Sequence, residues 1–149
     1  MSIPTKPSIW FHRISIAELN RPKDSLVDHL GIEVIEIGDD FLRARMPVDQ
    51  RTVQPMTKVL HGGASVALAE TLGSTGAWLC VDPQKHHVAG LEINANHVRA
   101  VKVGWVTAVA RPIHRGRTTQ LWDIRINDDT DKLVCISRFT VAVLDLPSR

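Results

Sequence analysis

The segment from residue 60 to residue 74, LHGGASVALAETLGS, contains residue types whose spacing could perform chemistry. It opens with His61, Gly62 and Gly63 and is then small or apolar as far as Glu70. On a helix, the neighbours of Glu70 three and four positions away carry no charge that could neutralise it: Val66, Ala67, Gly73 and Ser74. A carboxylate in apolar surroundings is costly unless something uses it, so we expect a substrate to use Glu70.

A helix that begins at Gly62 would present unpaired N–H groups and a partial positive charge at its N-terminus. Glycine at positions 62 and 63 leaves no side chain to stop a carbonyl oxygen from approaching these amides. The site could therefore stabilise an oxyanion, and thioester hydrolysis develops negative charge on such an oxygen. Glu70 could act as a general base on water or as a nucleophile that forms a mixed anhydride, and Ser74 could position the water.

The distance between these two groups predicts a dimer. Gly62 and Glu70 are eight residues apart in the sequence, which is about 12 Å along one helix. An acid on the same helix could hardly reach a carbonyl held at the helix N-terminus. Two copies of the helix, antiparallel across a two-fold axis, would bring Glu70 of one copy to Gly62 of the other, so we predict an obligate dimer with two equivalent sites.

The N-terminal part of the chain predicts two short helices and a hairpin. A Ser-x-x-Glu capping box begins a short helix at Ser15, and a second short helix from Ser25 closes at Gly31. Residues 32–37 and 42–48 flank a Gly-Asp-Asp turn, and the second run alternates apolar and arginine side chains. This alternation is typical of a half-buried strand.

The one long helix is predicted from Gly62 to about Leu79, and it is small or apolar on nearly all sides. We expect other elements to wrap it. Strand-like runs follow at residues 88–101, 105–114, 119–127 and 133–146, which we interpret as a meander of about four strands. The fold class is thus α+β, with the helix on one face of a curved sheet of five or six antiparallel strands.

Length and composition predict one globular domain over residues 10–149, after a loose arm at residues 1–9. The net charge of +2 and the lack of a dense Lys/Arg cluster argue against nucleic acid. Cys80 and Cys135 form neither a disulfide framework nor a zinc motif, and the adjacent His86 and His87 lack the spacing of metal ligands. With no signal-peptide core and no membrane span, we expect a soluble, reduced, cytoplasmic protein.

The segment LHGGASVALAETLGS, the later segment GLEINANHVR and this order of elements resemble the hotdog-fold acyl-CoA thioesterases. They are most similar to the branch that contains bacterial 1,4-dihydroxy-2-naphthoyl-CoA thioesterase and the enterobactin-pathway proofreading thioesterase. The resemblance covers roughly residues 10–145. It implies a curved antiparallel sheet wrapped around one central helix, and a dimer or a dimer of dimers.

The resemblance also implies a role for each residue of the motif. The catalytic carboxylate would be Glu70, and the amide that polarises the thioester carbonyl would be that of Gly62. Gln54 and His61 would orient the carbonyl and the water, and Ser74 would help to hold the water.

Coenzyme A carries phosphates, so basic residues near the pocket mouth should hold it. The substrate-binding candidates are Gly63, His97, Arg99, Arg117 and Arg138. Arg99 ranks first because it follows a predicted strand, and the turn that contains Arg117 ranks next.

We therefore predict a thioesterase that hydrolyses an aromatic (hydroxyaryl-type) or medium-chain acyl-CoA to the free acid and coenzyme A, without a metal or redox cofactor. Two alternatives stay open: a non-catalytic acyl-CoA-binding module, and a hotdog dehydratase or hydratase. Structural roles also compete, because Glu70 could be a buried acid paired with a basic strand residue and His61 a helix cap. The tryptophans at 78, 105 and 122 are expected in the core or an interface rather than in an acyl pocket.

Overall fold

Two short helices open the chain in the computed structural model, which describes residues 7–147. Helix α1 (Ile16–Leu19) begins with the predicted capping box, in which Glu18 N–H donates to Ser15 Oγ (3.2 Å) and Ser15 N–H donates to Glu18 Oε2 (3.0 Å). Helix α2 (Leu26–Leu30) ends at Gly31, whose φ of 70° is the left-handed conformation that favours glycine. Both predicted helices are confirmed.

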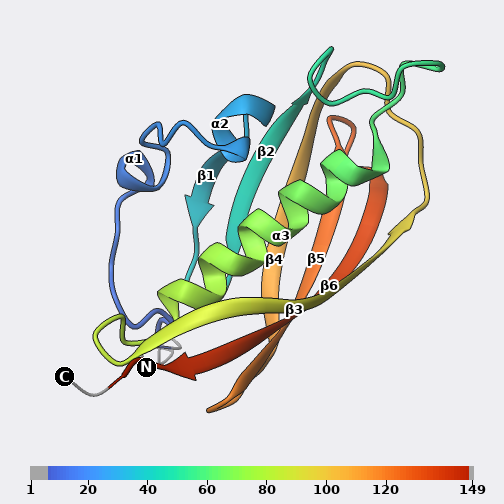
Figure 1. Cartoon of the computed structure of the whole chain (residues 1–149). Coiled ribbons are helices and arrows are strands. Elements are labelled where there is room, and N and C mark those ends of the chain that lie inside the picture. The colour runs from blue at the N-terminus through green and yellow to red at the C-terminus, as the bar shows by residue number, and fades with distance from the viewer. Residues whose placement is uncertain (1–6, 148–149) are drawn as a thin grey trace, which may run out of the picture.

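Six antiparallel strands form one curved sheet (Figure 1). They are β1 (Glu33–Ile37), β2 (Leu42–Val48), β3 (His86–His97), β4 (Gly104–Arg115), β5 (Thr119–Asp128) and β6 (Leu133–Asp145). Their order across the sheet is β1-β2-β4-β5-β6-β3. The predicted four-strand meander is therefore wrong for β3, which does not pair with β4. It pairs with β6 at the edge of the sheet, because residues 98–103 carry the chain past the β5–β6 hairpin before β4 begins.

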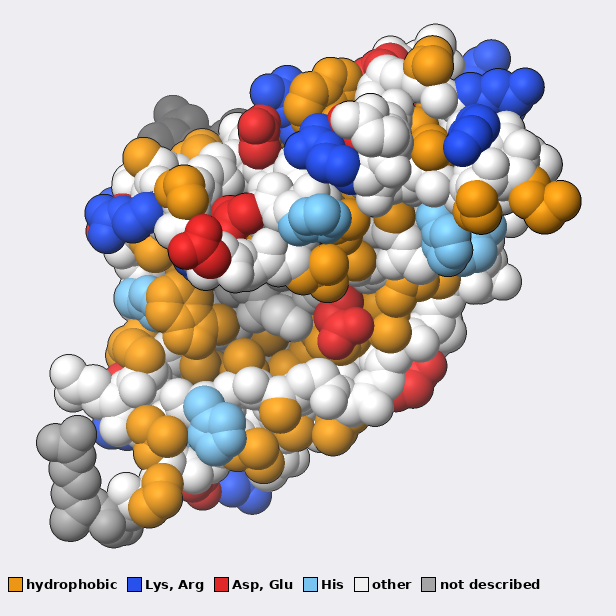
Figure 2. Space-filling model, turned by 45° about the horizontal axis from the view of Figure 1, so that its top comes forward, with side chains coloured by type: hydrophobic (Ala, Val, Ile, Leu, Met, Phe, Trp, Pro, Cys, Tyr) orange, Lys and Arg blue, Asp and Glu red, His pale blue; other side chains and the backbone are white. Residues whose placement is uncertain are grey.

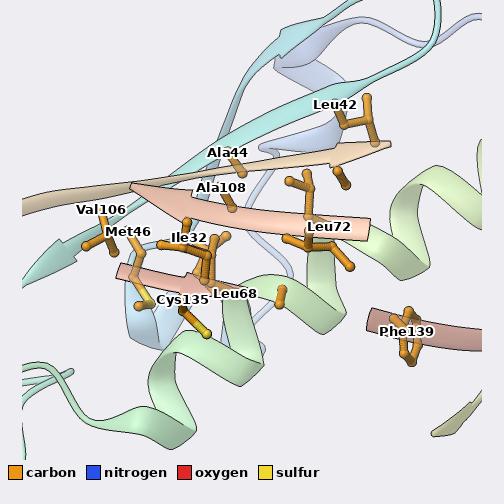
Figure 3. Close-up of a cluster of buried hydrophobic side chains, with 14 of the residues drawn as sticks. Ile32, Leu42, Ala44, Met46, Leu68, Leu72, Val106, Ala108, Cys135 and Phe139 are labelled. Atoms are coloured by element: carbon orange, nitrogen blue, oxygen red, sulfur yellow. The ribbon is translucent and has the colours of Figure 1, made fainter. Parts of the chain in front are cut away.

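Helix α3 (Gly62–Leu79) is the only long helix of the described residues, with the predicted bounds, and it lies across the sheet (Figure 1). Leu68 and Leu72 of α3 are fully buried against side chains of β2, β4 and β6. Figure 3 shows this cluster, which includes Leu42, Ala44, Met46, Val106, Ala108, Cys135 and Phe139. Burial of these apolar surfaces is the main force that holds α3 on the sheet.

Glycine lets α3 approach the sheet closely at one point in particular. A β-carbon built on Gly76 would lie 2.7 Å from Trp122 Cη2, and Trp122 is fully buried. Its indole also stacks on that of Trp10, with ring centroids 6.3 Å apart. Trp122 is therefore in the core, as predicted, whereas Trp105 lies half-exposed beneath the guanidinium of Arg45 at 4.2 Å.

The N-terminal segment crosses the end of the sheet. The predicted arm, residues 1–9, lies largely outside the described residues. Within the described part, Ile9 N–H donates to Asp39 O (2.9 Å), and Trp10 Nε1 donates to Gly38 O (2.6 Å). The chain from Ile9 onward is thus attached to the turn between β1 and β2.

Candidate active site

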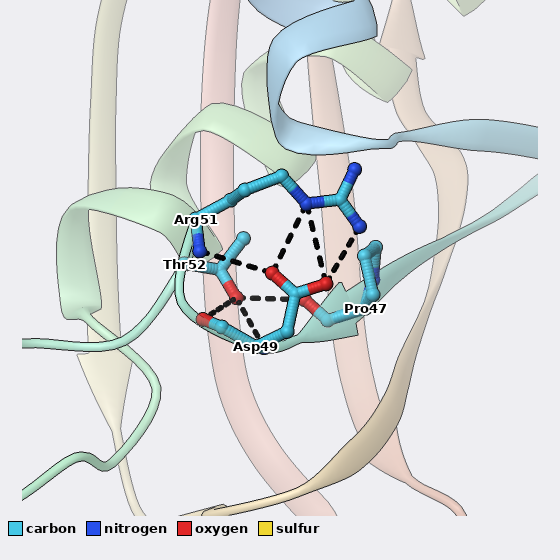
Figure 4. Close-up of polar contacts among 4 residues, drawn as sticks. All are labelled: Pro47, Asp49, Arg51 and Thr52. Carbon is cyan, nitrogen blue, oxygen red and sulfur yellow. Dashed lines mark hydrogen bonds and ion pairs between the residues drawn. The ribbon is translucent and has the colours of Figure 1, made fainter.

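The turn after β2 fixes the start of the loop that leads to α3 (Figure 4). Thr52 is buried, and its Oγ1 donates to Pro47 O (2.7 Å) and accepts from Asp49 N–H (3.1 Å). The Arg51 guanidinium hydrogen-bonds the Asp49 carboxylate (2.6 Å) and holds the pKa of that carboxyl below its usual range. Thr52 O then accepts from His61 N–H (2.8 Å), so the turn sets the position of His61.

His61 is the N-cap of α3. Its Nδ1 accepts from Gly63 N–H (2.9 Å), and its carbonyl accepts from the N–H groups of Ala64 (2.9 Å) and Ser65 (3.2 Å). A ring nitrogen that accepts this bond carries no proton, which assigns the neutral tautomer with the proton on Nε2. The predicted capping role of His61 is therefore confirmed, and its Nε2–H has no hydrogen-bond acceptor among residues 7–147.

This cap leaves one particular amide unused. Of the first four N–H groups of α3, those of Gly63, Ala64 and Ser65 have the partners just named. The N–H of Gly62 has no acceptor among residues 7–147. The group that the sequence assigns to the thioester carbonyl is thus the free donor at the helix N-terminus, where the helix dipole adds positive potential.

A cleft of about 430 Å³ opens beside this amide. Two predicted substrate-binding residues, His97 and Arg99, line it together with Gly62 and the buried Ser65. A β-carbon built on Gly62 would lie 2.9 Å from His97 Nε2, so the imidazole is against the helix N-terminus. Ser65 was not predicted from the sequence, because a serine in a small-residue helix carries no distinctive signal.

Backbone hydrogen bonds hold Gln54 near His61. Gln54 N–H donates to Val59 O (2.9 Å), and these two residues are each two positions along the chain from the hydrogen-bonded residues Thr52 and His61. Its side chain is half-exposed and engaged in its own turn, where Oε1 accepts from Met56 N–H (3.0 Å) and Nε2 contacts Thr57 Oγ1. The structure therefore brings Gln54 to the loop beside His61 but turns its amide toward that loop.

Glu70 lies on the open face of α3, and its side chain is exposed. Its Oε1 is 3.3 Å from the position of a β-carbon built on Gly90 of β3. No basic residue within the described range forms an ion pair with it, so this chain by itself does not supply the pairing that a buried structural acid would need. The expectation that Glu70 lies in apolar surroundings is not met within one chain, because only one side of α3 is covered by the sheet.

Ser74, one turn after Glu70, lines a separate apolar pocket of about 400 Å³. Figure 2 shows this side of the molecule, where hydrophobic side chains line a hollow. The pocket lies between α3 and the segment of α1, α2 and β1. Its walls are Leu19, Asn20, Lys23, Val27, Ile32, Val34, Thr71, Ser74, Thr75, Trp78 and Val88.

No sequence pattern predicts this pocket, and Trp78 is expected from the sequence in the core or an interface. Trp78 is one of its walls and is only half-buried, with its ring 4.3 Å from that of His12. The apolar residues of α1 and α2 are the sequence feature that could have indicated this pocket. Which residues of α3 face them, however, is set by tertiary packing and not by any local pattern.

Two residues predicted to contact coenzyme A, Arg117 and Arg138, line neither of these cavities. Arg138 is exposed on β6, where strand alternation turns it to the face opposite the buried Phe139 and therefore opposite α3. Arg117 is in the β4–β5 turn, next to Thr118, whose carbonyl accepts from Val143 N–H. That turn is at the other end of the sheet from the N-terminus of α3 (Figure 1).

Within residues 7–147, no group of three or more His, Cys, Asp or Glu side chains is arranged to hold a metal ion. None of the helices in this range combines the length and the apolarity needed to cross a membrane.

Comparisons with known proteins identify the family of the chain. The family model of the thioesterase superfamily matches residues 57–135. The chain is 47% identical over 137 residues to 1,4-dihydroxy-2-naphthoyl-CoA hydrolase of Escherichia coli, which covers 91% of this chain and 99% of that protein. It is also 47% identical over 137 residues to the proofreading thioesterase EntH of Cronobacter turicensis, which covers 91% and 98%.

The crystal structure of thioesterase HI1161 from Haemophilus influenzae superposes with a TM-score of 0.90 at 48% identity, covering 95% of this chain and 98% of that one. This likeness confirms the predicted hotdog fold. The homologues are thioesterases and esterases, which supports thioester hydrolysis as the reaction. From the matched family model, these relatives and the shared architecture, it follows that the chain belongs to the thioesterase superfamily and is a thioester hydrolase.

Proposed function

We propose that the protein hydrolyses an aromatic or medium-chain acyl-CoA to the free acid and coenzyme A. The observation that carries this proposal is the pair of unsatisfied groups on α3. The Gly62 N–H is the free donor at the helix N-terminus, and Glu70 is an exposed carboxylate without a partner among the described residues. A polarising donor and a base or nucleophile are what thioester hydrolysis requires.

The two groups would work together only between two copies of the chain. Their separation of about 12 Å along one helix is too long for one thioester to bridge. Strand β3 supports a dimer, since it is one of the two edge strands of the sheet and its outer side has no strand partner in the described part of the chain. A 12-residue edge with the exposed Leu91 is a surface that proteins normally cover.

In this arrangement the thioester carbonyl oxygen accepts from Gly62 N–H of one copy, and the acyl carbon faces Glu70 of the other. As a base, Glu70 takes a proton from water while the oxygen of that water bonds to the acyl carbon. As a nucleophile, its carboxylate bonds to that carbon and water later cleaves the anhydride. In both routes the C–S bond breaks, the thiolate leaves with the electron pair and takes up a proton, and the acid is released.

The pocket beside Ser74 supports the choice of acyl group. Its volume of about 400 Å³ and its apolar walls, which include Ile32, Val88 and Trp78, fit an aryl ring or a medium-length chain. The Escherichia coli relative is a hydrolase of an aromatic acyl-CoA by its name. Arg99, at the cleft beside Gly62, is the predicted contact for a coenzyme A phosphate.

The test is a thiol-release assay on the purified protein with benzoyl-, hydroxybenzoyl-, hydroxynaphthoyl- and straight-chain acyl-CoAs. Replacing Glu70 by Gln should lower kcat by at least about 10²-fold without unfolding the protein. Glu36→Gln is the matched control, because Glu36 is paired with Arg43 away from the site. If the wild type binds these thioesters and releases no thiol above background, the protein is a binding module and the proposal fails.

A further inference from the structure

We propose that His97 is a catalytic residue, which donates a second hydrogen bond to the thioester carbonyl oxygen beside the Gly62 amide. This inference rests on the proposed function. It differs from the expectation drawn from the sequence, in which His97 held coenzyme A by its phosphates.

The position of the imidazole carries the inference. A β-carbon on Gly62 would lie 2.9 Å from His97 Nε2, 3.1 Å from Cε1 and 3.3 Å from Cδ2. The β-carbon of a helical residue tilts toward the helix N-terminus, and the first N–H groups point the same way. His97 Nε2 therefore lies on the side of α3 from which a carbonyl oxygen must approach the Gly62 amide. An oxygen bound at that amide would lie beside Nε2.

The strand end holds the backbone that carries this ring. His97 is the last residue of β3 and pairs with Cys135 of β6. The next residue, Val98, donates its N–H to Val134 O (2.9 Å), and Arg99 Nε donates to Leu133 O (3.3 Å). The backbone on both sides of the ring is thus tied to β6. A donor whose backbone is fixed has only its side-chain rotation left to lose when it binds a substrate.

The ring is also available for the bond. Within the described residues neither nitrogen of His97 has a hydrogen-bond partner, whereas His61 uses Nδ1 to cap α3. Both the neutral ring with a proton on Nε2 and the protonated ring can donate from Nε2. The cleft of about 430 Å³ that His97 and Gly62 share gives the substrate access to both donors.

A phosphate contact is the less suitable role for this position. The pantetheine arm of coenzyme A separates its phosphates from the thioester by many bonds. A ring that touches the amide site therefore cannot also reach those phosphates. Arg99, two residues further along the chain and exposed, is better placed for them.

The first measurement is steady-state kinetics of His97→Ala and His97→Gln, with His29→Ala in the exposed part of α2 as the matched control. Removal of one oxyanion donor typically lowers kcat by about 10²–10³-fold. We expect His97→Ala to lose about 10²-fold in kcat with little change in KM, and His97→Gln, which keeps an N–H donor, to recover part of it. A rise in KM with kcat unchanged would assign His97 to coenzyme A binding and overturn the proposal.

A binding measurement separates this inference from the proposed function. Calorimetry would compare an acyl-CoA ketone, in which CH₂ replaces the sulfur, with an alkyl-CoA thioether that lacks the carbonyl. The wild type should prefer the ketone by about tenfold or more, and His97→Ala should lose several-fold of that preference. An unchanged preference, or no binding of either analogue, would refute the role of His97 whether or not the wild type hydrolyses thioesters.

Discussion

Gly62→Ala should separate activity from stability in this protein. The new β-carbon would lie 2.9 Å from His97 Nε2, which is too close, so the imidazole must move. Because His97 is exposed and the clash is with the far end of its side chain, rotation relieves it at little cost. Replacing glycine by alanine in a compatible conformation stabilises by about 0.4–1 kcal/mol through the unfolded state.

We therefore expect the melting temperature to stay the same or to rise by up to about 4 °C, since 1 kcal/mol corresponds to about 2–4 °C in a chain of this size. The activity should fall by about 10²-fold, because the methyl group crowds the approach to the Gly62 amide and displaces the second donor. Gly76→Ala gives the opposite pattern. Its β-carbon would meet the buried Trp122 at 2.7 Å, which cannot move aside.

Overpacking of that kind costs about 1–3 kcal/mol, so Gly76→Ala should melt several degrees lower while the folded fraction stays active. The assays are thermal unfolding by circular dichroism and thiol release with one acyl-CoA. A Gly62→Ala protein with wild-type kcat would refute the reasoning, because it would show that the reacting carbonyl does not approach this amide.

Four further predictions follow from single contacts. His61→Asn should keep the melting temperature, because an Asn side-chain oxygen can accept from Gly63 N–H. His61→Ala should lower the free energy of unfolding by about 0.5–2 kcal/mol in a denaturant titration. Equal stabilities of His61→Ala and the wild type would contradict the capping role. Trp78→Ala should shift the substrate preference toward bulkier acyl groups, and an unchanged rank order in the thiol-release panel would exclude this wall from the acyl site. Arg51 lowers the pKa of the Asp49 carboxyl. The carboxylate therefore stabilises the folded protein above its usual pKa of 3.8, and this stabilisation is lost as pH falls through the lower pKa of the folded state. The difference in unfolding free energy between wild type and Asp49→Asn, measured at several pH values, should vanish in that acid range. Burial raises the pKa of Cys80 to about 11, so mass spectrometry should find it unmodified by iodoacetamide at pH 7.5 in the native protein and modified after unfolding.

Local patterns predicted most of the elements, because each depends on neighbours in the chain. The capping box at Ser15 and the glycine at position 31 set the short helices, and α3 has the predicted bounds. The strand of residues 42–48 alternates as predicted. What failed was the partner of β3, since the choice between β4 and β6 depends on the path of residues 98–103 and not on the composition of the strand.

The candidate site also combines features that local sequence determines with contacts that it does not. The sequence by itself determined a helix that begins at Gly62 with a capping histidine and carries Glu70 eight residues later, because these positions are fixed by helix geometry alone.

Only the tertiary structure decided which distant residues meet them. The edge position of β3 places His97 against Gly62, and the packing of α1 and α2 makes Trp78 a pocket wall. Arg138 is turned away because strand alternation faces it opposite the buried Phe139. Contacts between residues far apart in the sequence depend on the order of the strands in the sheet, and that order is set by the burial of the whole core.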